Sequence, residues 1–329
     1  MKTEDRKVQS SKPKAQTNSP PVPAPLFLAG PTAVGKSAVA LLLAERLGGE
    51  IISVDSMQVY RGLDIGTGKP SPTERARVPH HLIDVLELTE GFDAAEFVRR
   101  AEQAVKEIQA RGRVPIVCGG TGLYFKAFRE GLGEAPPADD ALRAELHAAP
   151  LADLLRELEQ RDPVAFARID RQNPRRVVRA IEVIRLTGKP FSAQREDWKS
   201  PKSEVPSPKA GNFFALQREP DELHARINAR VEAMFRTGLV AETERLLTRG
   251  LAENRTAMQA LGYRQVVEHL RGERGLAETI ALVQTRTWQF ARRQMTWFRR
   301  QADLQWLLVE ASESAERSAE RVGALLARD

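Results

Sequence analysis

The segment "GPTAVGKS" at residues 30–37 is the feature that most constrains the fold of this chain. It matches every fixed position of the pattern G-x-x-x-x-G-K-[ST]. The apolar run "PLFLAG" precedes it and the helix-like run "KSAVALLLAERLGG" follows it. A strand, a glycine loop and a helix in this order bind phosphate, because backbone N–H groups and the helix dipole point at the anion. We therefore predict a di- or triphosphate site made of Gly30, Pro31, Thr32, Ala33, Val34, Gly35, Lys36 and Ser37.

Within this loop, two side chains have separate expected roles. Lys36 supplies a positive charge to the phosphates, and the hydroxyl of Ser37 is a ligand for Mg²⁺. The motif identifies the ligand class and leaves the chemistry open.

Strand and helix patterns alternate along the first part of the chain. Residues 50–56 and 114–122 have the pattern of buried strands, and residues 91–112 that of an amphipathic helix. This alternation predicts an α/β fold with a doubly wound parallel sheet. From residue 139 the pattern is helical, a strand is expected to return near "NFFALQ", and helices dominate again from Pro220.

The simplest domain organisation has three parts. A P-loop α/β core with C-terminal helices occupies residues 26–138 and 201–329, and a helical insertion occupies residues 139–200. Residues 1–25 are polar and proline-rich and lack the apolar stretch of a signal peptide, so we expect a disordered tail. A basic arm that helps to hold RNA is the alternative for this tail.

Composition narrows the functional class. The chain has 329 residues, is 42% apolar and 29% charged, and contains no apolar run long enough to span a membrane. Its single cysteine, Cys118, excludes an internal disulfide framework and points to a reducing compartment. We expect a cytoplasmic monomer with no membrane partner.

Asp55 follows the second predicted strand, in "EIISVDSMQVY". Ligands of open α/β sheets bind beyond the carboxyl ends of the strands, so Asp55 should face the phosphate loop. A carboxylate there can accept a proton from a nucleophile or hold Mg²⁺ through water. The alternative is a turn or helix cap.

A second glycine turn, "CGGTGLYFKA", follows the third predicted strand. Gly119 and Gly120 would let a substrate approach the backbone closely, and Thr121 offers a hydroxyl. The aromatic residues that follow, at 124, 125 and 128, are expected in the core.

Positive charge is concentrated in two segments. The net charge is +6, and residues 167–189 carry seven basic residues against Asp170 and Glu182. Residues 285–300 hold five arginines and no acid, and their seven-residue spacing places Arg286, Arg293 and Arg300 on one stripe of a helix. Such faces usually bind phosphate backbones, so they favour nucleic acid over a solvated or ion-paired surface.

Taken in order, "GPTAVGKS", "DSMQVYRGLDIGTGKP", "PHHLIDV", "GGTGLYFKA", "NPRRVVRAIEV", "ALGYRQ" and "RRQMTWFRR" resemble the tRNA isopentenyltransferase (tRNA dimethylallyltransferase) family. The resemblance runs from about Pro25 to Leu308. It implies transfer of a dimethylallyl group from dimethylallyl diphosphate to N6 of adenosine 37, in the anticodon stem-loop of tRNAs that read codons starting with U. Diphosphate is released, and Mg²⁺ is the implied cofactor.

The resemblance also implies residue roles. Asp55 matches the general base and Thr121 a threonine near the reacting adenine, while the phosphate loop holds the diphosphate. The positions that match tRNA-contacting residues are Asp55, Ser56, Met57, Gln58, Thr121, Arg143, Arg175, Arg176, Val177, Val178 and Arg179, and we add Arg293 from the second basic segment. Ser37 stands where the family often has threonine.

Without the resemblance, two other functions stay open. One is a P-loop kinase that phosphorylates a small acceptor with ATP, with Asp55 as the base. The other is an RNA-binding protein whose loop only binds nucleotide. The two arginine segments argue against a small-molecule kinase, which has little use for both.

Overall fold

The computed structural model describes residues 23–131, 136–196, 210–300 and 304–327. The expected tail at 1–25 lies outside the described residues except for residues 23–25, and the last residues of the expected insertion, 197–200, lie outside them too.

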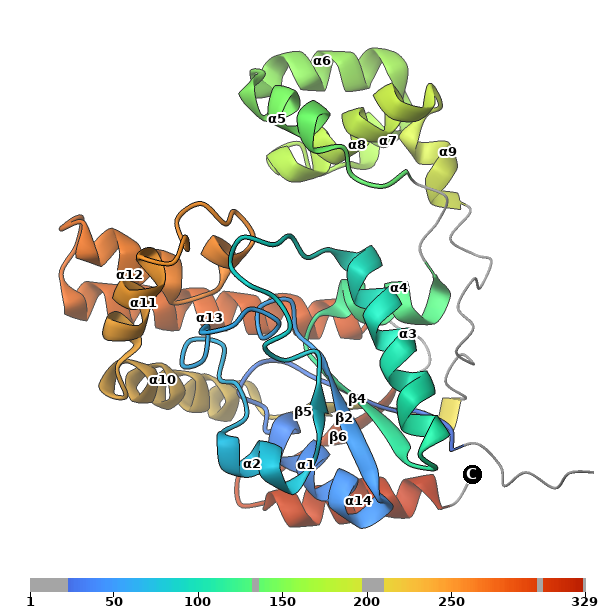
Figure 1. Cartoon of the computed structure of the whole chain (residues 1–329), viewed down its shortest axis with the longest axis vertical. Helices are drawn as coiled ribbons and strands as arrows, with labels where there is room; N and C mark the ends of the chain where they lie inside the picture. Colours follow the sequence, from blue (N-terminus) through green and yellow to red (C-terminus); the bar gives the residue numbers. More distant parts are fainter. Residues whose placement is uncertain (1–22, 132–135, 197–209, 301–303, 328–329) are drawn as a thin grey trace, which may run out of the picture.

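A six-stranded parallel sheet forms the centre of the core, as the alternation of strands and helices predicts (Figure 1). Its order is β3-β2-β4-β1-β5-β6, and every neighbouring pair is parallel. The strands are β1 (Leu26–Ala29), β2 (Gly49–Val54), β3 (His80–His81), β4 (Val114–Gly119), β5 (Phe213–Gln217) and β6 (Gln305–Leu308).

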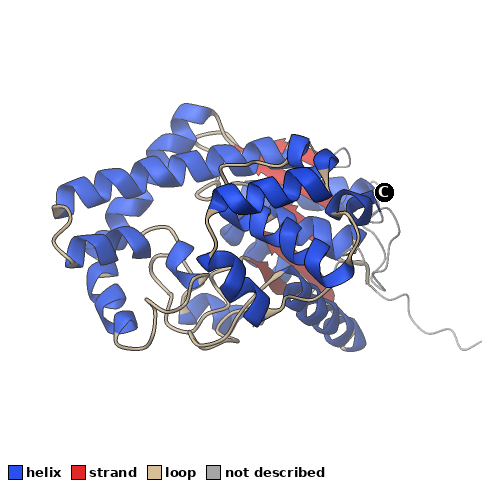
Figure 2. Ribbon diagram, turned by 90° about the horizontal axis from the view of Figure 1, so that it is seen from above, coloured by secondary structure: helices blue, strands red, loops and turns tan. Residues whose placement is uncertain are grey.

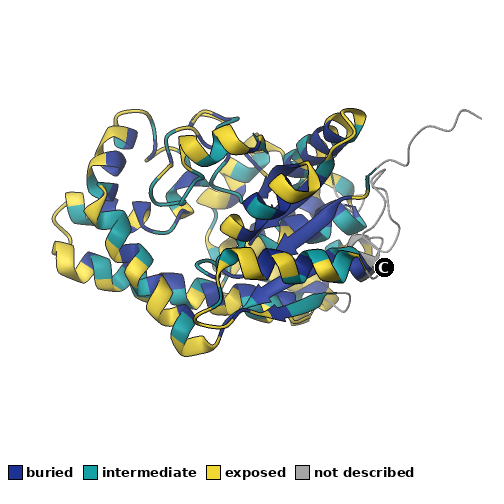
Figure 3. Cartoon of the chain, turned by 90° about the horizontal axis from the view of Figure 1, so that it is seen from below, coloured by how far each residue is buried: buried dark blue, intermediate teal, exposed yellow. Residues whose placement is uncertain are grey.

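Both faces of the sheet are covered by helices, so the four central strands β2, β4, β1 and β5 are largely buried (Figures 2 and 3). Successive side chains of a strand point to opposite faces. Phe27 and Ala29 accordingly join one apolar cluster, and Leu26 and Leu28 join the other. The first cluster includes residues of α3 (Ala94–Ala110), α4 (Gly122–Glu130), α11 (Leu239–Leu247) and α12 (Tyr263–Leu270). The second includes residues of α1 (Lys36–Leu47), α10 (Pro220–Arg236) and α14 (Ala315–Leu326).

The long helix α13 (Leu276–Phe298) contributes to both clusters. Ala291 and Phe298 are fully buried, so this helix has an apolar face turned to the core. The aromatic residues Tyr124, Phe125 and Phe128 are buried as predicted.

The helices of the expected insertion have an apolar cluster of their own, and Figure 1 shows them beyond one end of the core. Three of them begin at polar caps, the side chains of Asp139, Asp162 and Asn173, which accept hydrogen bonds from the first turn. The helices are α5 (Asp140–Ala148), α6 (Leu151–Arg161), α7 (Pro163–Arg168), α8 (Pro174–Thr187) and α9 (Phe191–Glu196).

Two strands and one short helix were not expected from the sequence. β3 has two residues, too few to show a periodicity. β6 has four residues, as β1 does, but no glycine loop follows it to mark it as a strand. Helix α2 (Pro72–Arg77) has only six residues and is capped at its N-terminus by Ser71. His80 and His81 have structural partners, the carbonyl of Val78 and the carboxylate of Glu50. Among the described residues, no helix is long and apolar enough to cross a membrane.

Candidate active site

Four segments meet at the carboxyl edge of the sheet. The phosphate loop follows β1, Asp55 follows β2, Gly120 and Thr121 follow β4, and Arg218 follows β5. These strands are adjacent in the order β2-β4-β1-β5, so the segments are neighbours in space. The expectation that the two glycine turns and Asp55 share one edge is confirmed.

The phosphate loop has the backbone that its glycines permit. Gly35 has a φ of +106° and precedes the first residue of α1, and Gly30 has a φ of +150°. Lys36 folds over the loop, with Nζ donating to the carbonyl of Pro31 at 3.0 Å. Burial lowers the pKa of Lys36 to about 8, although Asp55 partly opposes the shift.

A cavity of about 520 Å³ lies beside this loop. Lys36 and Ser37 form one wall, and Arg226 and Arg230 of α10 form the other. The two arginines are four residues apart and therefore lie on the same face of the helix. Burial lowers the pKa of Arg230, and the charge of Asp55 opposes that shift. Three cationic side chains around one cavity make a site for a polyanion.

Two arginines also hold the loop by its carbonyl groups. Arg226 Nε donates to the carbonyl of Ala33 at 3.0 Å. Arg218, which is 9% exposed, donates from Nε to the carbonyl of Val34 at 2.9 Å and from NH1 to that of Glu310 at 2.9 Å. These contacts fix the loop from the side of β5 and leave its N–H groups free of arginine contacts.

Asp55 caps a turn near the cavity. One carboxylate oxygen, Oδ1, accepts from the N–H of Met57 at 2.8 Å and from that of Gln58 at 3.3 Å. Its charge acts on Lys36 and on Arg230, which line the cavity. Asp55 can therefore cap the turn and still accept a proton, because the turn uses only one oxygen of the carboxylate.

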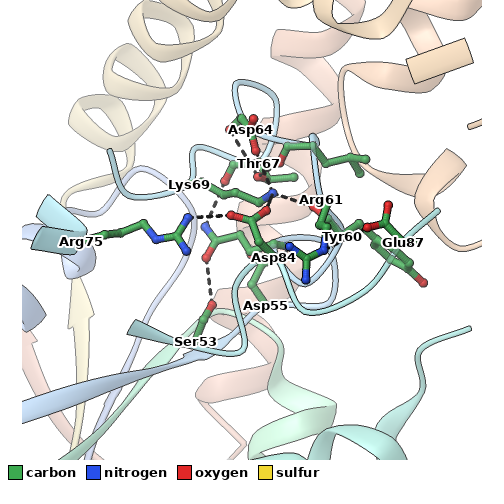
Figure 4. Close-up of polar contacts among 12 residues, drawn as sticks. Ser53, Asp55, Tyr60, Arg61, Asp64, Thr67, Lys69, Arg75, Asp84 and Glu87 are labelled. Atoms are coloured by element: carbon green, nitrogen blue, oxygen red, sulfur yellow. Dashed lines mark hydrogen bonds and ion pairs between the residues drawn. The ribbon is translucent and has the colours of Figure 1, made fainter. Parts of the chain in front are cut away.

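Gln58 connects Asp55 to the loop that carries Gly68. Figure 4 shows Asp55 and Thr67 from these two segments. Gln58 Oε1 accepts from the hydroxyl of Ser53 at 2.8 Å, and Gln58 Nε2 donates to the carbonyl of Thr67 at 3.3 Å. The buried Lys69 closes the same loop by donating to Asp64, Asp84 and the carbonyl of Tyr60. These contacts place Gly68 at the cavity wall.

Thr121 stands at the start of α4, next to β2. Its N–H and that of Gly120 both donate to the carbonyl of Val54 at 3.2 Å, one residue before Asp55. The Thr121 side chain makes no capping hydrogen bond to α4. Its hydroxyl is therefore not used by the helix.

The role expected for Gly119 and Gly120 needs correction. A Cβ at Gly119 would lie 2.2 Å from the carbonyl oxygen of Val54, and one at Gly120 would lie 2.3 Å from Nε2 of Gln294. Glycine is required at these two positions because β2 and α13 pack closely against them. The neighbour that leaves no room for a side chain is therefore the protein itself and not a substrate.

The arginine face of α13 is exposed. Arg286, Arg292, Arg293, Arg299 and Arg300 are all exposed, and within the described parts of the chain none of them pairs with a carboxylate. This face is available to a polyanion.

Two of the insertion arginines are arranged around the buried carboxylate of Glu182 (0% exposed). Arg143 Nε lies 2.8 Å from Glu182 Oε1, and Arg179 NH1 lies 2.6 Å from Oε2. Arg185 does not add a free charge, because it pairs with Glu145 and Glu157 of neighbouring helices.

Helix α8 begins with two exposed arginines and continues with two buried valines. Arg175 hydrogen-bonds to Gln259 and, at 3.4 Å, to the carbonyl of Arg255 in the core, and Arg176 is exposed. Val177 and Val178 are 0% and 4% exposed and belong to the insertion's apolar cluster. Their side chains do not reach the surface, so side-chain contacts of these two with tRNA are not supported.

Sequence reasoning missed several residues of the site, which are Arg218, Arg226, Arg230 and Gln294. The spacing of Arg226 and Arg230 in "LHARINARV" was a usable signal, since it follows a predicted strand. Gln294 was hidden in an arginine-rich segment whose charge dominated its interpretation.

The sequence of this chain is similar to those of several known proteins. A family model described as IPP transferase matches residues 58–301. The chain belongs to the IPP transferase family. A tRNA dimethylallyltransferase of Halorhodospira halophila is 49% identical over 287 residues, which cover 84% of this chain and 90% of the relative. One of Geobacter metallireducens is 46% identical over 286 residues, covering 86% and 91%.

The fold of this IPP transferase family member is also that of a solved relative. The crystal structure of a full-length tRNA isopentenylpyrophosphate transferase from Bacillus halodurans aligns with a TM-score of 0.66 and 37% identity. The alignment covers 93% of this chain and 97% of the solved chain. The resemblance stated from the sequence motifs is thereby confirmed.

Proposed function

We propose that this protein transfers a dimethylallyl group from dimethylallyl diphosphate to N6 of adenosine 37 in tRNAs that read codons starting with U. The observation that carries the proposal is the cationic cavity beside Asp55 in a member of the IPP transferase family. Its relatives named tRNA dimethylallyltransferase support the same reaction. Family membership does not favour the P-loop kinase.

In this proposal the cavity binds the leaving group. Lys36, Arg226 and Arg230 surround the diphosphate together with N–H groups of the phosphate loop. These charges stabilise the diphosphate as the bond between its oxygen and the allylic carbon breaks, and the electron pair stays on that oxygen. The loop thus binds a leaving group, and no phosphoryl group is transferred.

Asp55 is the proposed general base, and Thr121 lies beside the acceptor adenine. The N6 amine forms the new bond to the allylic carbon and loses a proton to the Asp55 carboxylate. A base in a stacked anticodon loop must leave the stack to reach this edge of the sheet. Ser56, Met57 and Gln58, which follow Asp55 directly, are further proposed contacts to the tRNA.

Five arginines, three exposed and two partly buried, are the proposed contacts to the tRNA backbone. Arg293 on α13, with Arg143, Arg175, Arg176 and Arg179 in the insertion, would hold the phosphates of the anticodon stem-loop. Val177 and Val178, on the same helix as Arg175, Arg176 and Arg179, pack in the apolar cluster of the insertion.

Mg²⁺ is the proposed cofactor. The exposed hydroxyl of Ser37 lines the cavity, and no cluster of three acidic, histidine or cysteine side chains occurs among the described residues. This donor set fits an ion bound mainly by diphosphate and water, as Mg²⁺ often is. When bound, the ion neutralises charge on the departing diphosphate.

We also propose that the protein acts in the cytoplasm and as a monomer.

A transfer assay tests the function. The protein and Mg²⁺ are incubated with an unmodified anticodon stem-loop carrying adenosine 37 and with labelled dimethylallyl diphosphate. The control stem-loop carries guanosine at that position, which has no N6 amine. Label in the first RNA alone is the expected result. No label in either, with ATP-dependent phosphorylation of a small acceptor, would replace the proposal with the kinase.

A further inference from the structure

Gln294 links the two substrate-binding segments of the site. It lies on the inward side of α13 and is 7% exposed. The N–H of Thr32 in the phosphate loop donates to its Oε1 at 2.9 Å, and its Nε2 donates to the carbonyl of Gly120 at 2.9 Å. One buried amide therefore joins the loop after β1 to the turn after β4.

The link continues to Asp55. Gly120 and Thr121 are held in turn by the carbonyl of Val54, at the end of β2. A hydrogen-bonded path thus runs from the phosphate loop through Gln294 and the Gly120–Thr121 turn to the residue before Asp55. The proposed function assigns these three segments to the leaving group, the acceptor base and the proton acceptor.

We propose that Gln294 is a positioning residue that sets the distance between the bound diphosphate and the acceptor adenine. This inference rests on the proposed function. Displacement at a carbon atom requires the nucleophile and the leaving group on opposite sides of that carbon, within about 3–3.5 Å of contact, and misplacement by 1 Å can cost on the order of 100-fold in rate. Gln294 spans the two segments that hold these groups.

The chemistry of the side chain suits this role. A glutamine amide donates and accepts at once, whereas a carboxylate only accepts and a thioether does neither well. The space is also fitted to it, because a Cβ at Gly120 would lie 2.3 Å from Nε2. The turn therefore rests directly on the amide.

The first test measures kcat and KM separately. Gln294→Met, of similar length, should lower kcat for transfer to the stem-loop by about 30- to 100-fold, while KM for both substrates changes less than threefold. The matched control is Gln265→Met in α12, since Gln265 is 9% exposed and accepts one hydrogen bond, from the N–H of Gly262. It should lower the melting temperature without lowering kcat.

A double-mutant cycle distinguishes positioning from general stabilisation. If Gln294 acts through the Gly120–Thr121 turn, Gln294→Met combined with Thr121→Ala should be little slower than the slower single variant. A rate equal to the product of the two single effects, or a kcat of Gln294→Met within threefold of wild type, would overturn the inference.

Two further variants of the experiment separate misfolding of Gln294→Met, and failure of the proposed function, from failure of the positioning role. If Gln294→Met does not fold, Gln294→Glu takes its place, because it keeps the acceptor for Thr32 and removes the donor to Gly120. The wild-type protein in the same assay reports on the proposed function itself. A wild type that transfers label, with Gln294 variants that transfer equally well, rejects only the positioning role.

Discussion

Replacing Asp55 by asparagine isolates its role as a base. Only Oδ1 of Asp55 is used by the turn, accepting from the N–H groups of Met57 and Gln58. The amide oxygen of asparagine can accept both hydrogen bonds, so the loop should keep its shape. What the variant loses is the ability to take a proton from the N6 amine.

The size of the effect follows from that comparison. Loss of a general base typically lowers a rate by 10²- to 10⁴-fold, equivalent to about 3–5.5 kcal/mol in the activation barrier. Asp55→Ala should be at least as slow and should also lose two hydrogen bonds, about 0.5–1.5 kcal/mol of stability each. The melting temperature should therefore fall for alanine and stay near wild type for asparagine.

The assay is a single-turnover measurement of labelled dimethylallyl transfer at saturating stem-loop, with stem-loop affinity measured separately. Asp55→Asn with a rate within threefold of wild type would refute the role as a base. A large loss of stem-loop affinity with a normal rate at saturation would instead make Asp55 a binding residue.

Three further changes probe the charges of the site. Arg230→Met should raise KM for dimethylallyl diphosphate by about 10- to 100-fold, because a hydrogen bond to a charged group contributes about 1.5–3 kcal/mol. If calorimetry shows unchanged diphosphate binding in this variant, Arg230 does not contact the diphosphate. Lys36, with a pKa lowered to about 8, loses its proton as pH rises through that value. Diphosphate affinity should therefore fall above pH 8, a dependence that Lys36→Met should lack. The unfolded chain keeps this proton up to the ordinary value of 10.5, so the free energy of unfolding should rise between these pH values. Glu182→Gln leaves Arg143 and Arg179 without their carboxylate and should cost about 3 kcal/mol of stability in denaturant unfolding. A loss below about 1 kcal/mol would show that these partly buried arginines do not depend on Glu182.

Much of the core was predictable because its signals are local. The glycine loop, the strand before it and the helix after it are contiguous, and Asp55 follows the next buried strand directly. Parallel strands bring their carboxyl ends to one edge, so the sequence order of these motifs already implied a shared site. The insertion helices were equally visible from their patterns, and their arginines from composition.

The sequence by itself predicted a phosphate-binding loop and a carboxylate at the same edge of the sheet. Only the tertiary structure decided what surrounds them. Arg226 and Arg230 come to the cavity because α10 packs beside the loop, and Gln294 reaches Thr32 across 262 residues of sequence. Tertiary packing also buried Val177 and Val178 in the insertion. It paired Arg185 with Glu145 and Glu157, although the sequence pattern had placed this arginine in a basic segment. Such contacts depend on how helices pack against one sheet, and no local pattern in the chain encodes the distance between their side chains.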